Sequence, residues 1–252
     1  LIAAGAIYGL AVTAAFGYNR LEVRGTTLTS EDAIRARVAL TPGENLVGLA
    51  TEPIAARVRE LPSVRGVDVS VGLPDVLVVD ITERRPIVVW AIGERRFAVD
   101  DTGLLFADVG ADARAGAGVG GIPVVRDDRA LATALGVASV LDPVDLDAAT
   151  RLGSLTPIQI NSHAGGLHVR ITDDRGFTVN SGSGGWLAVF GFYGRSQRTP
   201  ALIPGQVQLL AGLIAGREDT VATMILADEK EGTYLPKATP RPTRTPKPTP
   251  KP

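Results

Sequence analysis

Residues 61–86 read LPSVRGVDVSVGLPDVLVVDITERRP, and this stretch decides the fold of the N-terminal part of the chain. Apolar and polar residues alternate from Val67 to Val71, and again from Leu77 to Thr82. An alternation with a period of two predicts two half-buried strands. Leu73-Pro74-Asp75 lies between them and is typical of a tight turn, so we expect a hairpin here.

The residues before this hairpin predict one more strand and two helices. A short alternating run, Arg20 to Arg24, is broken by Gly25. Thr29 or Ser30 can cap a helix that carries Ile34 and Val38 on one face. A second helix begins near Thr51, with its apolar stripe at Ile54, Val58 and Leu61 and its end at Pro62. The order β-α-α-β-β predicts a small sheet covered by two helices.

The following residues, 88–235, predict a β-rich domain with covering helices. An apolar run at 87–92 and a turn at Asp100-Asp101-Thr102-Gly103 indicate further strands. We expect the later elements to be helices at 128–141 and 145–152, a hairpin at 167–179, a strand at 186–192, a helix at 204–214 and a last strand at 220–226. The fold class is therefore α+β.

The chain opens on an uncharged run, Leu1 to Tyr18, which reads LIAAGAIYGLAVTAAFGY. As a helix it would be roughly 27 Å long, close to the thickness of the hydrocarbon core of a bilayer. A signal-peptide core is the alternative, but such cores are shorter and are followed by a cleavage site of small residues. We expect a single transmembrane helix at 1–18, and a chain whose start is truncated because Leu1 lies within the apolar run.

Charge and composition separate the C-terminal tail from the rest of the chain. The 252 residues carry a net charge of −1 and contain no cysteine. Disulfides, thiolate zinc sites and cysteine nucleophiles are thereby excluded. Pro236 to Pro252 contains seven prolines and five basic residues without an acid, so we expect an extended, disordered tail. Its charge could bind an anionic wall polymer.

The residue types that carry chemistry are not arranged as a catalytic or metal site. His163 and His168 flank a glycine pair and have no evident third ligand. Ser181 to Gly185 lacks the lysine and the following helix of a phosphate-binding loop. The adjacent acids Asp100-Asp101, Asp127-Asp128 and Asp173-Asp174 are typical of turns and caps. We therefore expect no enzyme, no cofactor and no nucleic-acid site.

Several motifs, in order and at matching spacing, resemble the FtsQ/DivIB cell-division family. They are Leu21-Glu22-Val23-Arg24-Gly25, Pro42-Gly43-Glu44-Asn45-Leu46, Leu61-Pro62-Ser63-Val64, Leu73-Pro74-Asp75, Glu83-Arg84-Arg85-Pro86 with Trp90, and Val99 to Phe106. The resemblance implies a POTRA-like domain of the FtsQ type at 19–87, a β-rich domain at 88–235 and the tail at 236–252. The segment Ile225-Leu226-Ala227 departs from the family's common last strand.

This resemblance also implies a function. Such a protein is a single-pass scaffold of the plasma membrane at the division septum, with its bulk outside the cytoplasm. It binds the coiled-coil proteins FtsL and FtsB/DivIC and helps to control septal peptidoglycan synthesis. Two alternatives are a POTRA-bearing component of a protein-translocation system and a membrane-anchored cell-wall hydrolase. The first would need several POTRA copies or a barrel, and the second a zinc or serine signature.

In this family the coiled-coil partner binds near the last strand of the β-rich domain. By position, this implies Thr220, Ala222, Met224, Leu226 and Tyr234 as partner-binding residues. We expect the strand at 220–226 to lie at the edge of its sheet, where a partner strand could add. The alternative is that Met224 and Leu226 belong to the core and that Tyr234 is an incidental loop residue.

Overall fold

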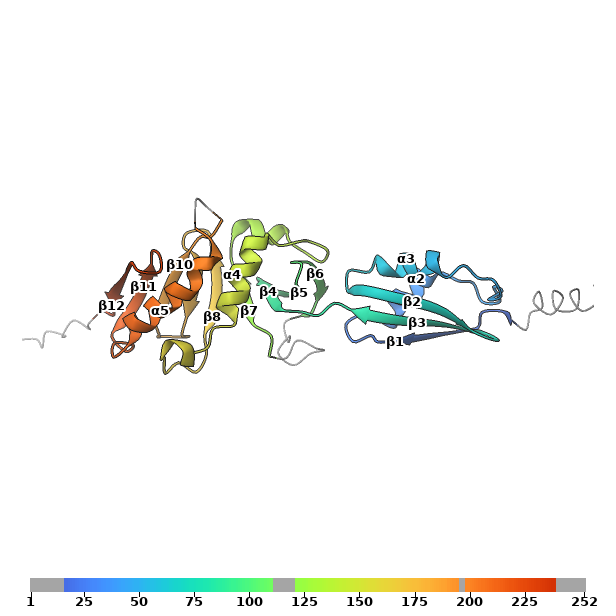
Figure 1. Cartoon of the computed structure of the whole chain (residues 1–252), viewed down its shortest axis with the longest axis horizontal. Coiled ribbons are helices and arrows are strands. Elements are labelled where there is room, and N and C mark those ends of the chain that lie inside the picture. The colour runs from blue at the N-terminus through green and yellow to red at the C-terminus, as the bar shows by residue number, and fades with distance from the viewer. Residues whose placement is uncertain (1–15, 111–120, 195–197, 239–252) are drawn as a thin grey trace, which may run out of the picture. The chain divides into compact units, whose positions relative to one another are not determined.

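The structure is a computed structural model, and it describes residues 16–110, 121–194 and 198–238 (Figure 1). The chain divides into two compact units, Leu1–Gly153 and Ser154–Pro252. Among the described residues, no helix has the length and apolar character needed to cross a membrane. The predicted anchor falls mostly on residues 1–15, which lie outside the described residues.

The first unit begins with the predicted β-α-α-β-β arrangement. Its elements are β1 (Arg20–Arg24), α2 (Glu31–Val38), α3 (Glu52–Arg59), β2 (Val64–Gly72) and β3 (Val76–Glu83). The strand order is β1-β3-β2, with β1 parallel and β2 antiparallel to the central β3. The two helices lie on the same face of this sheet (Figure 1).

Local sequence explains where the two helices begin. Ser30 is the N-cap of α2, and its side chain accepts a hydrogen bond from the Ala33 N–H at 3.2 Å. Glu31 and Asp32 lie in the first turn, where negative charge favours the helix dipole. The start of α3 carries a proline, which a helix tolerates in its first turn because the N–H there has no partner. Of the two predicted caps, Thr29 and Ser30, the structure uses Ser30.

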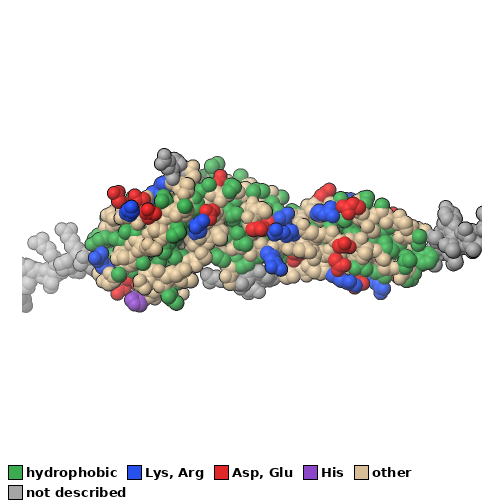
Figure 2. Space-filling view, in the orientation of Figure 1, with side chains coloured by type: hydrophobic (Ala, Val, Ile, Leu, Met, Phe, Trp, Pro, Cys, Tyr) green, Lys and Arg blue, Asp and Glu red, His purple; other side chains and the backbone are tan. Residues whose placement is uncertain are grey.

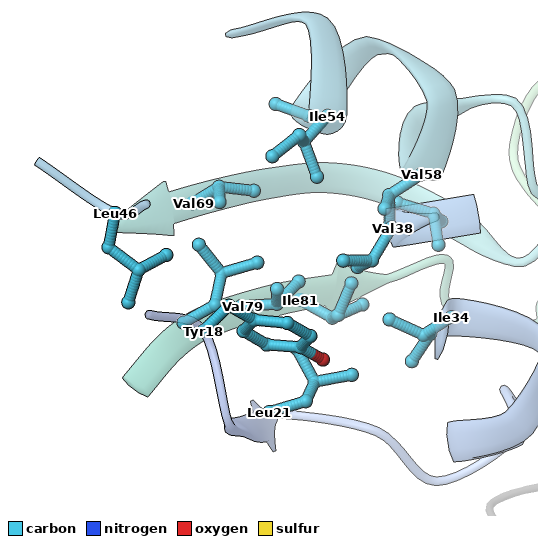
Figure 3. Close-up of a cluster of buried hydrophobic side chains, with 13 residues drawn as sticks. Tyr18, Leu21, Ile34, Val38, Leu46, Ile54, Val58, Val69, Val79 and Ile81 are labelled. Carbon is cyan, nitrogen blue, oxygen red and sulfur yellow. The ribbon is translucent and has the colours of Figure 1, made fainter. Parts of the chain in front are cut away.

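Aliphatic side chains from the helices and the sheet form one core (Figure 3). Ile34 and Val58 from the helices meet Val79 and Ile81 from the central strand, and all four side chains are buried. Tyr18 also belongs to this core, with 6% of its surface exposed. Tyr18 is the last residue of the predicted transmembrane helix at 1–18, but it is buried in this core, one residue before the predicted domain boundary at Asn19.

The rest of the first unit adds four strands and a helix. These are β4 (Val88–Ile92), β5 (Arg95–Val99), β6 (Leu105–Asp108), β7 (Val124–Asp127) and α4 (Pro143–Gly153). The strand order is β7-β4-β5-β6, with β4 and β7 parallel and the other pairs antiparallel. Every residue of β4 is buried, and α4 packs on β4 and β7.

The helix that we predicted over Asp128–Leu141 is wrong. Only a short 3-10 helix, η2 (Ala130–Ala134), forms there. Leu131 is 86% exposed, whereas the leucines of an amphipathic helix would face the core. Ala138 has a φ of 71°, and the backbone from there to Leu141 bonds to residues 103–105 as an added strand would. Strand β7 was not predicted.

The segment that leaves β3 is fixed by two side chains. The Glu83 carboxylate accepts hydrogen bonds from the backbone N–H groups of Thr27, Leu28 and Thr29. Arg84 donates to the Pro62 carbonyl at 2.9 Å and to the buried Asp100 carboxylate at 2.6 Å. These bonds hold the residues at the end of β3 against the loop at 27–29 and against Asp100.

The same loop places Leu28 against the following sheet. Its loop is fastened by Glu83, and the Leu28 side chain packs against the buried cluster of Val89, Ala98 and Phe106 in the following sheet. The domain formed by β1–β3 and its two helices is thus joined to the sheet of β4–β7 by the ion pair of Arg84 with Asp100 and by the apolar contact of Leu28.

The second unit contains the hairpin β8 (His168–Thr172) and β9 (Gly176–Asn180), then β10 (Leu187–Gly191), α5 (Ile203–Ile214), β11 (Val221–Leu226) and β12 (Gly232–Pro236). Two short 3-10 helices, η3 (Ile158–Ile160) and η4 (Pro200–Leu202), precede the first hairpin and α5. The strand order is β12-β11-β10-β9-β8. Strands β10 and β11 are parallel, so α5 forms the crossover between them (Figure 1).

We expect Ile81→Ala to destabilise the first unit by about 2–5 kcal/mol, the usual cost of emptying a buried aliphatic site. Ile81 is 6% exposed on the central strand. Denaturant unfolding measures the loss, with the neighbouring, exposed Thr82→Ala as the control. A loss no larger than that of the control would contradict the packing described.

Arg84→Ala should destabilise the chain by about 2–4 kcal/mol, because it leaves the buried carboxylate of Asp100 without its cation. The matched control is Arg85→Ala, which removes an exposed arginine from the next position and should change stability by less than about 0.5 kcal/mol. Equal effects of the two substitutions in thermal unfolding would show that the ion pair has no specific role.

Candidate partner-binding site

A buried glutamine fixes the two parallel strands next to the candidate site. Gln206 lies on α5 with no exposed surface, and its amide nitrogen donates to the carbonyls of Phe190 at 3.3 Å and Leu226 at 3.0 Å. Its amide oxygen accepts from the Tyr193 hydroxyl at 2.6 Å. Arg198 adds a bond to the Phe190 carbonyl at 2.7 Å and another to Ala227. The carboxyl ends of β10 and β11 are therefore held at a fixed spacing.

A short turn then returns the chain antiparallel to β11. The Asp228 carboxylate accepts hydrogen bonds from the N–H groups of Lys230 and Glu231, both at 2.7 Å. These two bonds lower the pKa of Asp228. The Ala227 N–H donates to the Glu231 carbonyl and closes the turn, after which Gly232–Pro236 pairs with β11 as β12.

Strand β12 lies at the end of its sheet. Ala227 bonds to Glu231 at one end of the pairing, and the Lys237 N–H donates to Thr220 at the other. Antiparallel strands turn every second residue toward the partner strand. Thr233 and Leu235 therefore direct their backbone groups toward β11, whereas the N–H and C=O groups of Gly232 and Tyr234 point away from it. Within the part of the chain that the structure describes, β11 is the strand paired with β12.

The side chains of β12 make the edge distinctive. Tyr234 is 43% exposed, and the Arg217 guanidinium lies 5.6 Å from the centre of its ring, within the range of a cation–π interaction. Leu235 lies opposite Thr223 on the other face of the strand and is 55% exposed. The edge thus offers an aromatic ring on one face and an aliphatic side chain on the other.

The structure separates the residues that we predicted for the partner site. Met224 and Leu226 are buried, and Ala222 is half-buried in the interior strand. Thr220 is exposed just before β11, and its hydroxyl donates to the Arg217 carbonyl. Tyr234 lies at the open edge. Met224 and Leu226 are therefore core residues, which agrees with the alternative prediction that they do not form the partner surface.

The expectation that the strand at 220–226 forms the edge is wrong, because β12 covers it. The charged run Glu229-Lys230-Glu231 did not indicate a turn, but it forms a hairpin turn that depends on the Asp228 side chain. The signal was present in the sequence, since Asp228 is a turn-forming residue and Thr233-Tyr234-Leu235 is a short β-prone run.

A carboxylate supports the turn that leads into β11. Glu218 accepts hydrogen bonds from the His163 N–H at 2.8 Å, from the Trp186 indole at 2.9 Å and from the Ser162 hydroxyl. Partial burial opposes its ionisation, but these three hydrogen bonds and a fourth from the His163 ring outweigh burial and lower its pKa to about 2. Glu218 therefore links the loop at 162–163 and the start of β10 to the segment before β11.

The other residues that we weighed for chemistry have local roles. His163 also contacts Glu218 through its ring, and Ser181 accepts a hydrogen bond from the Trp186 N–H at 2.8 Å. Asp127 is buried and pairs with Arg129 at 2.8 Å. Across residues 16–110, 121–194 and 198–238, no three His, Cys, Asp or Glu side chains are grouped as a metal site would require.

Comparison with known families identifies the first domain. Residues 16–84 match the family model of the POTRA domain, FtsQ-type. The chain carries an FtsQ-type POTRA domain. The match begins at Phe16, whose carbonyl accepts a hydrogen bond from the Leu46 N–H, and it ends at the Arg84 that bonds to Asp100.

Relatives with the same name extend the similarity. The chain is 34% identical over 110 residues to cell division protein FtsQ of Streptomyces venezuelae, covering 43% of this chain and 41% of that one. It is 38% identical over 106 residues to FtsQ of Novosphingobium aromaticivorans, covering 41% and 32%. With FtsQ of Streptomyces coelicolor the values are 29% over 153 residues, covering 56% and 58%. The chain thus aligns with about a third to three-fifths of the length of these relatives, and the predicted resemblance to FtsQ is confirmed.

Glu218→Gln should destabilise the chain by about 2 kcal/mol near neutral pH, because the ionised carboxylate is the common acceptor of three donors. The folded-state pKa lies below the usual 4.5, at about 2, so this contribution is complete above about pH 5 and is lost as the pH falls toward 2. Unfolding of both forms as a function of pH measures it.

The exposed neighbour Asp219→Asn serves as the control and should change stability little at any of these pH values. A stability difference for Glu218→Gln that stays constant from pH 7 to about pH 2 would show that the carboxylate charge is not what stabilises this turn.

Proposed function

We propose that this protein is a membrane-anchored scaffold of the bacterial cell-division machinery, and that it binds a coiled-coil division protein of the FtsL or FtsB/DivIC type at β12. The observation that supports this most is an open strand edge in a chain whose POTRA domain is of the FtsQ type and whose relatives are cell division proteins. These names favour division over the translocation and hydrolase alternatives.

The chemistry of the edge suits strand addition. An incoming strand would pair with the outward N–H and C=O groups of Gly232 and Tyr234 and with the carbonyl of Pro236. Main-chain bonds of this kind supply affinity, and flanking side chains supply selectivity. Tyr234 is the natural anchor, because aromatic residues dominate binding energy at interfaces. Pro236 has no N–H, so it limits the length of the added strand.

The proposed scaffold acts by holding its partners and needs no cofactor. Leu1 to Ala15 would form most of the membrane anchor, with the POTRA domain, the β-rich domain and the basic tail outside the cytoplasm at the division septum. By holding its partner there, the protein would help to control septal peptidoglycan synthesis. The domain limits proposed for this organisation are 19–87 and 88–235, with the first domain extended back to Phe16.

Substitutions at position 234 test the added strand. Tyr234→Pro removes the ring and the outward N–H but leaves the bonds to β11 in place, and Tyr234→Ala removes the ring alone. We expect Tyr234→Ala to weaken binding of a purified FtsB-type partner by about 1–3 kcal/mol, as at an aromatic hot spot. Tyr234→Pro should weaken it further by about 1 kcal/mol, the worth of one hydrogen bond.

The control for folding is circular dichroism, since neither substitution removes a bond between β11 and β12. Pull-down from membranes with identification of the co-purifying proteins tests the class of partner. If folded Tyr234→Pro binds the partner as tightly as the unchanged protein, strand addition at β12 is wrong.

A further inference from the structure

One end of the POTRA domain holds the chain where it arrives from the N-terminal segment. We call this end the anchor-side tip and define it by residues 42–49 and 72–75. Hydrogen bonds fasten the incoming chain to both segments: Leu46 N–H to Phe16 O at 2.9 Å, Tyr18 N–H to Glu44 O at 2.7 Å, Gly43 N–H to Tyr18 O at 2.7 Å, and Asn19 N–H to Asp75 O at 3.0 Å. The uncharged N-terminal run therefore leaves the domain from this tip.

No polar spacer separates that run from the domain. Leu1 to Tyr18 contains no charged residue, yet Tyr18 is already buried in the POTRA core. Gly17 forms a β-bridge with Asn45, so the last residues of the run are already bound to the domain. A membrane anchor formed by the preceding residues would bring the tip against the bilayer surface.

The tip also exposes large aliphatic side chains. Val47 is 41% and Leu73 59% exposed, and these are the large exposed hydrophobic residues of the domain among its described residues. Both lie at the tip, in two loops far apart in sequence. The Val47 N–H donates to the Asn45 side chain at 2.8 Å, which shapes the turn that presents Val47. In Figure 2, hydrophobic side chains reach the surface at this end of the domain.

The charges near the tip are compatible with lipid headgroups. The tip carries two acids, Glu44 in segment 42–49 and Asp75 in segment 72–75, and the Glu44 carboxylate accepts a hydrogen bond from the Thr41 N–H at 3.2 Å. Arg20 is exposed just beyond the tip, where its long side chain can reach a phosphate. The remaining exposed tip residues include Pro42 and Pro74, which are uncharged.

We propose that the anchor-side tip is a membrane-contact surface, with Val47 and Leu73 inserted among the headgroups of the bilayer. The proposal rests on the membrane anchor under Proposed function and adds that the POTRA domain lies on the lipid surface. Two aliphatic side chains alone would bind a membrane weakly, but the anchor holds them at the surface continuously, so the contact is intramolecular in effect. It fixes how the domain is oriented on the membrane.

The absence of cysteine from the chain makes the test direct. Val47→Cys and Leu73→Cys are labelled singly with a polarity-sensitive fluorophore in the full chain, reconstituted in vesicles of phosphatidylethanolamine and phosphatidylglycerol. We expect a blue shift of the emission, and loss of its intensity when the vesicles contain nitroxide-labelled lipids. Leu131→Cys, an 86% exposed site beyond the POTRA domain, is the matched control and should show neither change.

Flotation of the vesicles and extraction with carbonate test the anchor separately. If the chain floats and resists extraction but the labels at positions 47 and 73 behave like the label at 131, the tip proposal is wrong and the anchor stands. If carbonate releases the chain, the anchor is wrong and the tip proposal falls with it. Leu73→Asp should reduce the quenching of the label at position 47, and unchanged quenching would overturn the role of Leu73.

Discussion

The arrangement of the candidate site depends on the hydrogen bonds that Gln206 makes to two parallel strands. Parallel strands cannot be joined by a tight turn, so the crossover through α5 leaves the relative positions of β10 and β11 to be set by other contacts. The buried amide of Gln206 binds one carbonyl from each strand. Without those bonds, the amide nitrogen of Gln206 would be buried without an acceptor, which is costly. Because β11 is fixed in this way, β12 can pair with it and form the edge.

Several carboxylates in this protein accept hydrogen bonds from backbone N–H groups. Glu83, Asp100, Glu218 and Asp228 each accept hydrogen bonds from main-chain N–H groups of a loop. Asp100 shows the electrostatic consequence, because burial raises its pKa while the Thr102 hydroxyl, the Arg84 guanidinium and two N–H groups lower it by more. Loops that lack a ladder of their own are ordered by such acceptors. Acids in turn sequences therefore account for much of this chain's ordered irregular structure.

Elements were predicted correctly where apolar residues repeat with the period of a strand or a helix. The hairpin at 64–83 and the helix at 203–214 have clear periods, and both form as predicted. The segment at 128–141 has leucines at helical spacing, but it forms only a short 3-10 helix and Leu131 stays exposed. Gly136 disfavours a helix, and Asp127 pairs with Arg129 at the start of the segment. The edge strand was predicted at 220–226 and is instead β12, because the turn before β12 depends on a single aspartate side chain and not on a pattern.

An open edge is also a liability, since any extended segment could pair with it. Here β12 has five residues, Pro236 ends its outward row of donors, and charged residues Lys230, Glu231 and Lys237 flank it. Two outward N–H groups give an added strand few main-chain bonds, so backbone pairing alone would be weak and unselective. Selectivity must then come from side chains on the two faces of the edge, where Tyr234 and Leu235 lie. A partner with one apolar residue for each face would contact both of these side chains. Because this edge is short, its pairing depends on the side chains that a partner brings to Tyr234 and Leu235.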